Sequence, residues 1–191
     1  MNNSLCFIDF EASSLNPSSY PIEVAWSLED GSIESHMINP YAIETWMDWD
    51  PASQAVHGLS RNILSNEGKH PKWVAQRMNT VLADKVLLTN AYDWDWDWCD
   101  TLFKAAQESM QFKFGDAWHV FGQKLNLEPS IGNVVLEQPV SAQAMNDALR
   151  KFSDSAWQRI TGKRHRASVD VQQLQLMLAL IDEHNRERIN S

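Results

Sequence analysis

Short runs of apolar, β-prone residues occupy the first part of the chain. Their pattern predicts strands over residues 4–10, 22–28 and 32–38, with the turn Glu29-Asp30-Gly31-Ser32 between the last two. The opening of the chain therefore indicates antiparallel strands. A further run, residues 85–89, is mostly apolar and predicts a buried strand.

Helical spacing of apolar residues dominates the rest of the chain. Short helical pieces are predicted within residues 52–64, and a helix over 71–84 begins at Pro71, a residue suited to the first helical position. Longer helices are predicted over residues 94–111, 141–152 and 167–188. Strands first, and then a strand among helices, predict an α/β fold with a mixed β-sheet flanked by α-helices.

The composition fits one globular domain over residues 1–191. Hydrophobic residues make up 43% and charged residues 21%, and no linker-like segment divides the chain. The longest apolar run near the C-terminus, residues 176–181, is too short to cross a bilayer, and the first residues lack a secretory leader. We therefore expect a cytoplasmic protein with no membrane partner, whose two cysteines, Cys6 and Cys99, are reduced core residues.

Acidic residues outnumber basic ones by 25 to 16, which gives a net charge of −9. This balance argues against a protein that coats nucleic acid through a broad positive field, but it is compatible with an enzyme that holds a polyanion through metal ions. Nine tryptophans are present, and an exposed indole can stack on a base. Most are expected in the core, including Trp98. Exposure is expected for Trp46 and Trp49 in an irregular segment, and a place beside the substrate for Trp94 or Trp96.

Two carboxylates end the first predicted strand. Asp9 and Glu11 follow apolar residues and are two positions apart, so both lie on the same face of the strand. One acid at a strand end is unremarkable, whereas two on one face indicate a metal or catalytic site.

A second acidic group follows the predicted strand at 85–89, where three aspartates compete for a role. Asp95 shares a helical face with apolar residues and points toward the sheet, whereas Asp97 falls on a polar face. Asp93 lies before the predicted helix and has an alternative role as its cap. Helical phase therefore favours Asp95, with Asp93 as the alternative.

A third acid, Asp170, leads the apolar face of the last predicted helix, where a buried carboxylate needs a partner. Its alternative role is to stabilise the helix N-terminus. If Asp170 converges with the three earlier acids, charges about 4 Å apart repel by roughly 4 kcal/mol at an effective dielectric constant near 20. Divalent cations would relieve this repulsion, and oxygen-only ligation suits Mg²⁺ or Mn²⁺ rather than zinc.

These acidic segments, in this order, resemble the motifs of the DEDD superfamily of 3′–5′ exonucleases, in its histidine-bearing branch (DEDDh). Residues 9–15, Asp-Phe-Glu-Ala-Ser-Ser-Leu, are similar to the first motif, D-x-E-T-T-G-L. Residues 89–95 resemble the second motif, H-N-A-x-F-D, with one extra residue before Asp95. His165 precedes Asp170 with the H-x(4)-D spacing of the branch. Two further segments that resemble family segments are residues 21–25 and 56–60.

The resemblance implies a ribonuclease-H-like fold and release of nucleoside 5′-monophosphates from the 3′ ends of single-stranded nucleic acid, with RNA favoured over DNA. It implies two divalent metal ions, Mg²⁺ or Mn²⁺. Asp9 would bridge both ions, Glu11 and Asp170 would complete one site, and Asp95 would act mainly at the second. His165 would remove a proton from the attacking water, a task that its ordinary pKa near 6.5 suits.

Further residues and alternative functions stay open. His57 is a candidate contact for the 3′-terminal nucleotide, with a structural role in a His-Gly turn as the alternative. Arg164 and Arg166 are candidate phosphate contacts, with a solvated loop as the alternative. A homodimer is compatible with the resemblance. The alternative functions are a non-catalytic nucleic-acid or protein-binding module and a hydrolase of very short oligonucleotides or dinucleotides.

Overall fold

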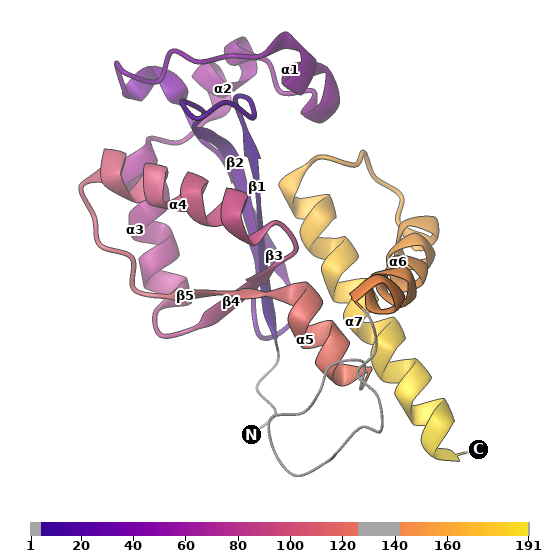
Figure 1. Ribbon diagram of the computed structural model, residues 1–191. Coiled ribbons are helices and arrows are strands. Elements are labelled where there is room, and N and C mark those ends of the chain that lie inside the picture. Colours follow the sequence, from indigo (N-terminus) through magenta and orange to yellow (C-terminus); the bar gives the residue numbers. More distant parts are fainter. Residues whose placement is uncertain (1–4, 126–141, 191) are drawn as a thin grey trace.

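A five-stranded mixed sheet forms the centre of the computed structural model, which describes residues 5–125 and 142–190 (Figure 1). The strand order is β3-β2-β1-β4-β5. The strands are β1 (Cys6–Ala12), β2 (Pro21–Ser27), β3 (Ile33–Met37), β4 (Val86–Thr89) and β5 (Lys113–Asp116). β2 pairs antiparallel with both β1 and β3, as the opening pattern predicts, whereas β4 pairs parallel with β1 and β5.

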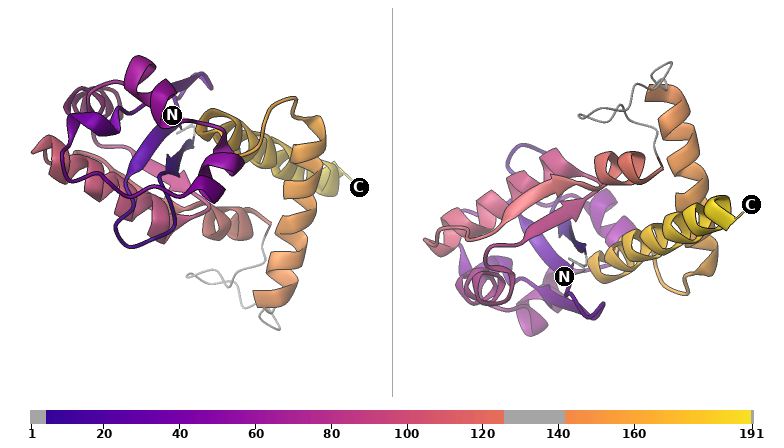
Figure 2. Two further views of the ribbon diagram at one scale, coloured as in Figure 1. Left: turned by 90° about the horizontal axis from the view of Figure 1, so that it is seen from above. Right: turned by 90° about the horizontal axis from the view of Figure 1, so that it is seen from below.

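Helices cover both faces of this sheet (Figures 1 and 2). The helices that pack on one face are α3 (Pro71–Leu82) and α4 (Tyr92–Ala106). Those on the other face are α5 (Ala117–Lys124), α6 (Ala142–Arg159) and α7 (Ala167–Asn190). Three short elements lie beyond the ends of β1 and β2: the 3₁₀ turn η1 (Pro40–Ala42), α1 (Pro51–His57) and α2 (Arg61–Glu67).

Side chains along β1 alternate between two hydrophobic cores. Ile8 and Phe10 pack with α3 and α4, whereas Phe7 packs with α5, α6 and α7. Asp9 and Glu11 continue the Phe7 face, because residues two apart lie on one face of a strand. The pleat of β1 therefore directs both carboxylates toward the face of the sheet on which α7 lies.

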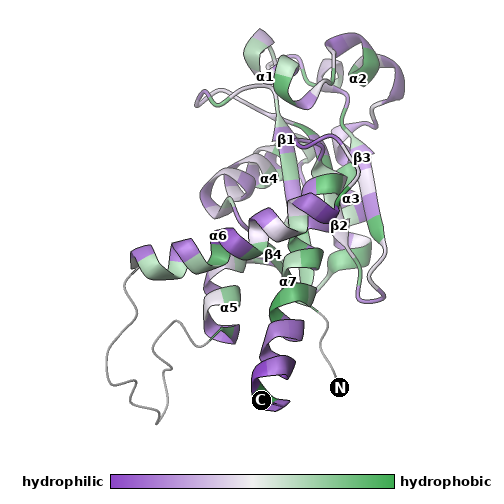
Figure 3. Ribbon diagram, turned by 90° about the vertical axis from the view of Figure 1, so that its right-hand side faces the viewer, coloured by the Kyte–Doolittle hydropathy of each residue, from purple (hydrophilic) through white to green (hydrophobic). Residues whose placement is uncertain are grey.

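The first half of α7 packs on the sheet and the second half leaves it. Buried residues extend from Ala167 to Ile181 and the helix contacts β1, β2 and β3. Beyond Ile181 the side chains of α7 are polar except for the exposed Ile189, and Figure 3 shows mostly hydrophilic last turns at the C-terminal end of the helix. The sheet-facing end of α7 is therefore the end that carries Asp170.

Several element boundaries differ from the predicted ones. The sequence pattern predicts neither β5, which has one large apolar residue and a glycine, nor α5, which is only eight residues long. α4 ends at Ala106, five residues earlier than predicted, and its C-cap Gln107 has the left-handed conformation (φ 55°). α6 continues to Arg159, well beyond the predicted end at residue 152. Most of the predicted separating stretch, residues 122–140, lies outside the described residues.

The environments of the tryptophans follow the predictions only in part, because three of the nine, Trp26, Trp46 and Trp98, are buried although most are expected in the core. Trp98 is buried and Trp94 and Trp96 are exposed. Trp46 is buried, so its predicted exposure is wrong: the ring stacks on Tyr20 with centroids 4.9 Å apart and planes 3° from parallel. Trp49 is half-buried. The cysteines Cys6 and Cys99 are buried thiols, as predicted. No helix in the described part of the chain has the length and apolar character of a membrane span.

Candidate active site

Three carboxylates from distant segments meet beyond the end of β4. Oxygens of Asp9, Glu11 and Asp170 all lie within 4.8 Å of one another. Asp9 and Glu11 come from β1, and Asp170 comes from the first turn of α7. The parallel pairing of β1 with β4 reaches only Phe7 and Leu88, so the acid-bearing half of β1 extends past its parallel neighbour. Open α/β sheets bind ligands at this carboxyl edge.

Burial raises the pKa of every carboxyl in this cluster, and repulsion from neighbouring carboxylates raises the pKa of Asp9 and Glu11 further. The pKa of Asp9 lies well above its usual range because the group is buried and the charges of Asp95 and Asp170 are close. Burial, together with Asp170, raises the pKa of Glu11 to about 8. The pKa of Asp170 is raised by burial and lowered in part by His165. Protons or cations must therefore occupy this cluster near neutral pH, and its oxygen-only ligands fit Mg²⁺ or Mn²⁺.

Asp95 lies beside the cluster but outside the group of oxygens within 4.8 Å. Its side chain is 1% exposed, as its helical phase predicts, and Asp97 on the other face is exposed. Thr89 donates its hydroxyl to Oδ2, while Oδ1 has no hydrogen-bond partner in the described part of the chain. Burial raises the pKa of Asp95 to about 7, although the bonds from Thr89 and the Phe10 backbone lower it. An unpartnered buried carboxylate oxygen costs free energy that a cation would offset.

Asp93 has a different place from the predicted one. α4 begins at Tyr92, two residues earlier than predicted, so Asp93 lies inside the first turn and is exposed. Ala91 occupies the N-cap position, and no side-chain hydrogen bond caps the helix. The prediction that Asp93 precedes and caps this helix is therefore wrong. Between the two aspartates, the structure places Asp95 and not Asp93 next to Asp9.

His165 lines the same cavity as the three clustered acids. Its side chain is exposed, and its backbone has a φ of 61°, in the left-handed region that residues other than glycine adopt rarely. It stands immediately before Arg166, whose backbone N–H donates to Oδ2 of Asp170 at 3.1 Å. The chain therefore turns sharply at His165 and enters α7 with the two site residues on the same cavity.

A cavity of about 460 Å³ opens over these groups. Leu15 and Val56 also line the cavity and are both exposed, so they give it an apolar edge. Asp48 fixes the segment that carries Leu15, because its carboxylate accepts hydrogen bonds from Ser13 (3.0 Å) and Ser14 (2.5 Å). The site thus combines an anionic cluster with an apolar rim.

His57 also lines this cavity and is 3% exposed. Its Nδ1 accepts a hydrogen bond from the Leu59 N–H at 3.0 Å, so the neutral ring carries its proton on Nε2. Nε2 has no partner among the described residues. Burial lowers the pKa of His57 to about 4, so the ring is neutral at pH 7. His57 therefore makes the structural bond of the turn and keeps a second nitrogen for a ligand.

The two candidate phosphate-binding arginines both have partners within the protein. Arg166 donates Nε and Nη2 to the two oxygens of Glu23, at 3.0 and 2.6 Å. The guanidinium of Arg164 lies over the Trp157 ring, 4.4 Å from its centroid. The contacts to phosphate stay predictions, and both side chains would have to serve them in addition to their present partners.

The sequence patterns do not predict Glu23 as a site residue. It lies in β2 opposite Glu11, is 1% exposed, and accepts a third bond from the Ala167 N–H at 3.0 Å. A signal exists in the sequence, because Glu23 is the one charged residue in the strand Pro21–Ser27. A charge in so apolar a strand requires a partner of opposite charge.

No protein-family model matches the chain, and no curated protein matches it. Among solved structures, a zinc-bound complex of E. coli exonuclease I with single-stranded DNA has a TM-score of 0.66 and 15% sequence identity, over 96% of this chain and 41% of that chain. The complex of E. coli exonuclease I with a dT13 oligonucleotide has a TM-score of 0.64 and 14% identity, over 97% and 42%. An apo exonuclease I structure has a TM-score of 0.61 and 16% identity, over 94% and 42%.

The fold is therefore the ribonuclease-H-like exonuclease fold, as the resemblance implies, with its mixed sheet and flanking helices. The chain spans about two-fifths of the length of these solved exonuclease structures.

Proposed function

We propose that the chain is a metal-dependent 3′–5′ exonuclease that hydrolyses phosphodiester bonds at the 3′ ends of single-stranded nucleic acid and releases nucleoside 5′-monophosphates. The observation that carries this proposal is the cluster of Asp9, Glu11 and Asp170 in one cavity with His165. The likeness to E. coli exonuclease I, whose solved structures hold single-stranded DNA, supports it. The proposed exonuclease domain covers residues 1–191.

The four acids would hold two divalent ions, Mg²⁺ or Mn²⁺. Asp9, Glu11 and Asp170 supply clustered oxygens, and Asp95 supplies the unpartnered Oδ1 beside them. Bound ions would neutralise these carboxylates and stabilise the charge that develops on phosphate during an in-line displacement. Without such ions the raised pKa values keep part of the cluster protonated near neutral pH.

His165 would act as the general base that takes a proton from the attacking water. It lines the cavity beside the acids and is exposed, so the proton can pass to solvent. Its position before α7 brings it to the same edge of the cavity as Asp170.

His57 would bind the 3′-terminal nucleotide through its Nε2–H. The donor is buried, unpartnered and lines the cavity, so an acceptor oxygen of the nucleotide would satisfy it. Because the pKa of His57 is about 4, this donor stays neutral throughout the range in which such an enzyme would work. The apolar edge at Leu15 and Val56 would contact the base of the same nucleotide.

A hydrolase of very short oligonucleotides is the second candidate function. One observation favours it: Arg164 and Arg166, two of the basic residues in the segment beside the cavity, are held by Trp157 and Glu23. A long phosphate backbone would then find few unengaged cations in this segment. RNA as the preferred substrate stays a prediction, and the similar solved structures hold DNA.

The proposal is tested with 5′-labelled single-stranded RNA and DNA, from dinucleotides to long oligonucleotides, incubated with Mg²⁺, Mn²⁺ or EDTA. We expect a metal-dependent ladder that shortens from the 3′ end and is absent with the Asp9→Ala variant. Relative rates rank the two sugars and the substrate lengths. Absence of a ladder with both metals, or an unchanged ladder with Asp9→Ala, would contradict the proposal and favour the binding-module alternative.

A further inference from the structure

Glu23 is bound by three donors from one short segment of the chain. Arg166 donates Nε and Nη2 to its two carboxylate oxygens, and the backbone N–H of Ala167 donates to Oε2 at 3.0 Å. The Glu23 side chain is 2% exposed, whereas the Arg166 side chain is 36% exposed. The contact therefore anchors the start of α7 to the middle of β2.

This anchor reaches both site residues of the segment. Arg166 follows His165 directly in the chain, and its own N–H donates to Asp170. On the other side, Glu23 is the strand partner of Glu11 in the β1–β2 pair. The ion pair between Glu23 and Arg166 thus connects β2 with the segment that carries His165 and Asp170.

The ring of His165 needs such an anchor, because Asp170 holds the backbone of His165 while its side chain is exposed. Its ring is exposed, and its backbone occupies the left-handed region, which costs a non-glycine residue free energy. The neighbouring residues 161–164 are exposed as well. A conformation of this kind persists only where the surroundings over-determine it.

The ion pair itself is a poor means of stabilising the fold. Burying Glu23 requires desolvation of its charge, and buried ion pairs often contribute no more stability than well-packed apolar residues. A role in fixing geometry accounts for the pair better than a role in stability.

We propose that Glu23 and Arg166 form a positioning pair that holds His165 in its catalytic place over the acid cluster. The proposal rests on the proposed exonuclease function for its kinetic consequences. It adds two residues that act on the reaction through the position of His165.

The first experiment is a double-mutant cycle between Glu23 and His165, with kcat and KM measured on a short oligonucleotide. We expect Glu23→Gln to lower kcat by about tenfold to a hundredfold while KM changes little, since a small misplacement of a catalytic group has effects of this size. In the His165→Ala background the same change should lower kcat by less than about twofold, because no base is left to misplace.

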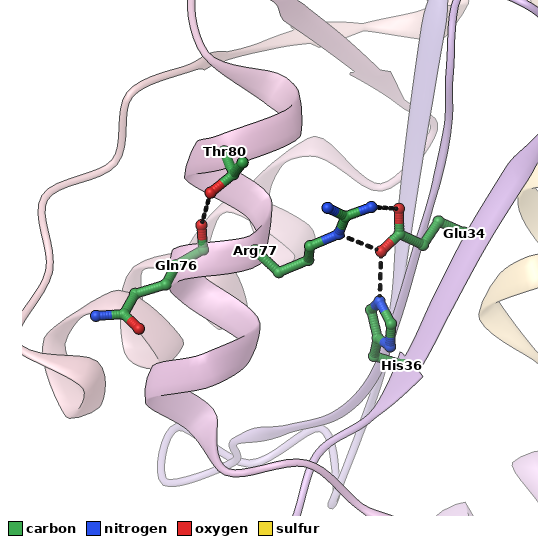
Figure 4. A network of polar contacts seen from close by, with 5 residues as sticks. All are labelled: Glu34, His36, Gln76, Arg77 and Thr80. Carbon is green, nitrogen blue, oxygen red and sulfur yellow. Dashed lines mark hydrogen bonds and ion pairs between the residues drawn. The ribbon is translucent and has the colours of Figure 1, made fainter.

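Glu34→Gln is the matched control. Glu34 in β3 accepts from Nε and Nη2 of Arg77 in α3 at 2.7 and 2.9 Å, the same two-bond geometry at a place remote from the cavity (Figure 4). We expect its kcat and KM to match those of the wild-type protein. An equal loss of kcat in both variants would make the effect of Glu23 a general one on stability and overturn the proposal.

A readout that needs no activity separates the two proposals. Trypsin cleaves after Lys163 and Arg164, which are exposed in the anchored segment. We expect Glu23→Gln to accelerate cleavage there and Glu34→Gln to leave it unchanged. If the wild-type protein proves inactive, the proposed function fails, but this assay still supports the anchor when cleavage accelerates and overturns it when cleavage does not.

A second variant covers the case in which Glu23→Gln does not fold. The double change Glu23→Leu with Arg166→Leu removes both charges and leaves only the Ala167 N–H without its acceptor. We expect it to fold, as circular dichroism would show, with a lowered kcat and faster cleavage after Lys163. Wild-type kcat in this folded variant would overturn the proposal.

Discussion

Individual carboxylates on α4 differ in chemistry because the helix turns them toward different surroundings. Asp93 and Asp95 are two positions apart, yet the first is exposed and the second is 1% exposed. Burial raises the pKa of Asp95 to about 7, and its Oδ1 has no hydrogen-bond partner among residues 5–125 and 142–190. Two identical side chains therefore differ in their readiness to bind a cation.

We expect Asp95→Asn to lower exonuclease turnover by about a hundredfold and to weaken Mn²⁺ binding, because the amide replaces one of the proposed ligand oxygens. Asp93→Asn is the matched control and should change neither quantity. Turnover and Mn²⁺ titration calorimetry check both variants. Similar losses in the two variants would show that the charge of the helix N-terminus, and not the position of Asp95, matters.

In the proposed function His165 is the general base and Asp9 is a metal ligand. His165→Ala should lower turnover severely and spare Mn²⁺ affinity, whereas Asp9→Ala should abolish both. Calorimetric titration of Mn²⁺ into each purified variant separates the two effects. Loss of metal binding in His165→Ala with retention in Asp9→Ala would reverse the assignment.

The sequence predicts some residues of this site better than others for a physical reason. Asp9 and Glu11 share a strand face and Asp95 has a helical phase, so local periodicity places all three. Glu23 has no such local signature, because its meaning depends on Arg166, 143 positions away. A partner at that distance is visible only after the chain has folded.

At the scale of elements, the turn after α1 is a contact point for the segment before α7. Gly58 ends α1 with a φ of 78°, in the left-handed region, and Lys163 approaches it so closely that a Cβ there would collide with the ammonium group. Gly31 has a similar φ of 84° with no atom within 4 Å of an added Cβ. The two glycines thus share a left-handed backbone conformation, which glycine adopts without strain, and differ in their neighbours.

We expect Gly31→Ala and Gly58→Ala each to lower the free energy of unfolding by about 1–2 kcal/mol, the cost of a left-handed backbone for alanine. Only Gly58→Ala should also displace Lys163 and thereby accelerate tryptic cleavage after it. Chemical denaturation and the cleavage assay measure the two effects. Equal cleavage in both variants would contradict a contact between this turn and the segment before α7.

The elements that the sequence pattern predicts are those with long or regular hydrophobic spacing. β1, β2, β3, α3 and α7 all have it, and their predicted ranges overlap the observed ones closely. β5 is only four residues long and pairs with β4 through backbone hydrogen bonds. The pattern of apolar and polar side chains does not predict such a pairing. The sequence likewise does not mark the start of α4, because its N-cap residue Ala91 makes no side-chain hydrogen bond.

For the molecule as a whole, the acid cluster couples stability to pH. The pKa of Glu11 is raised from an ordinary 4.5 to about 8 in the folded protein, so the folded state binds more protons than the unfolded state between these values. Stability of the metal-free protein therefore falls as pH rises through this window. His57 has the opposite effect, because its pKa is lowered from 6.5 to about 4, but it acts only below pH 6.5.

We expect the melting temperature of the protein in EDTA to fall between pH 6.5 and about 8. Over this window the free energy of unfolding should decrease by at most about 1.4 kcal/mol per pH unit for each such carboxyl. Saturating Mg²⁺ should flatten the dependence, because cations replace protons in the cluster. Glu11→Gln should make the metal-free dependence shallower. Equal melting temperatures across this window in EDTA would contradict proton uptake by the cluster.

The alternation of side chains along β1 also makes the site sensitive to a shift of the strand by one residue. Ile8 and Phe10 face one core, and Asp9 and Glu11 face the cavity, so deleting one residue upstream would exchange the two sets. The acids would then enter a hydrophobic core and the apolar side chains would replace them at the site. We expect single-residue insertions or deletions to abolish activity in β1 and to be tolerated at the Gly31 turn, where no atom lies within 4 Å of an added Cβ.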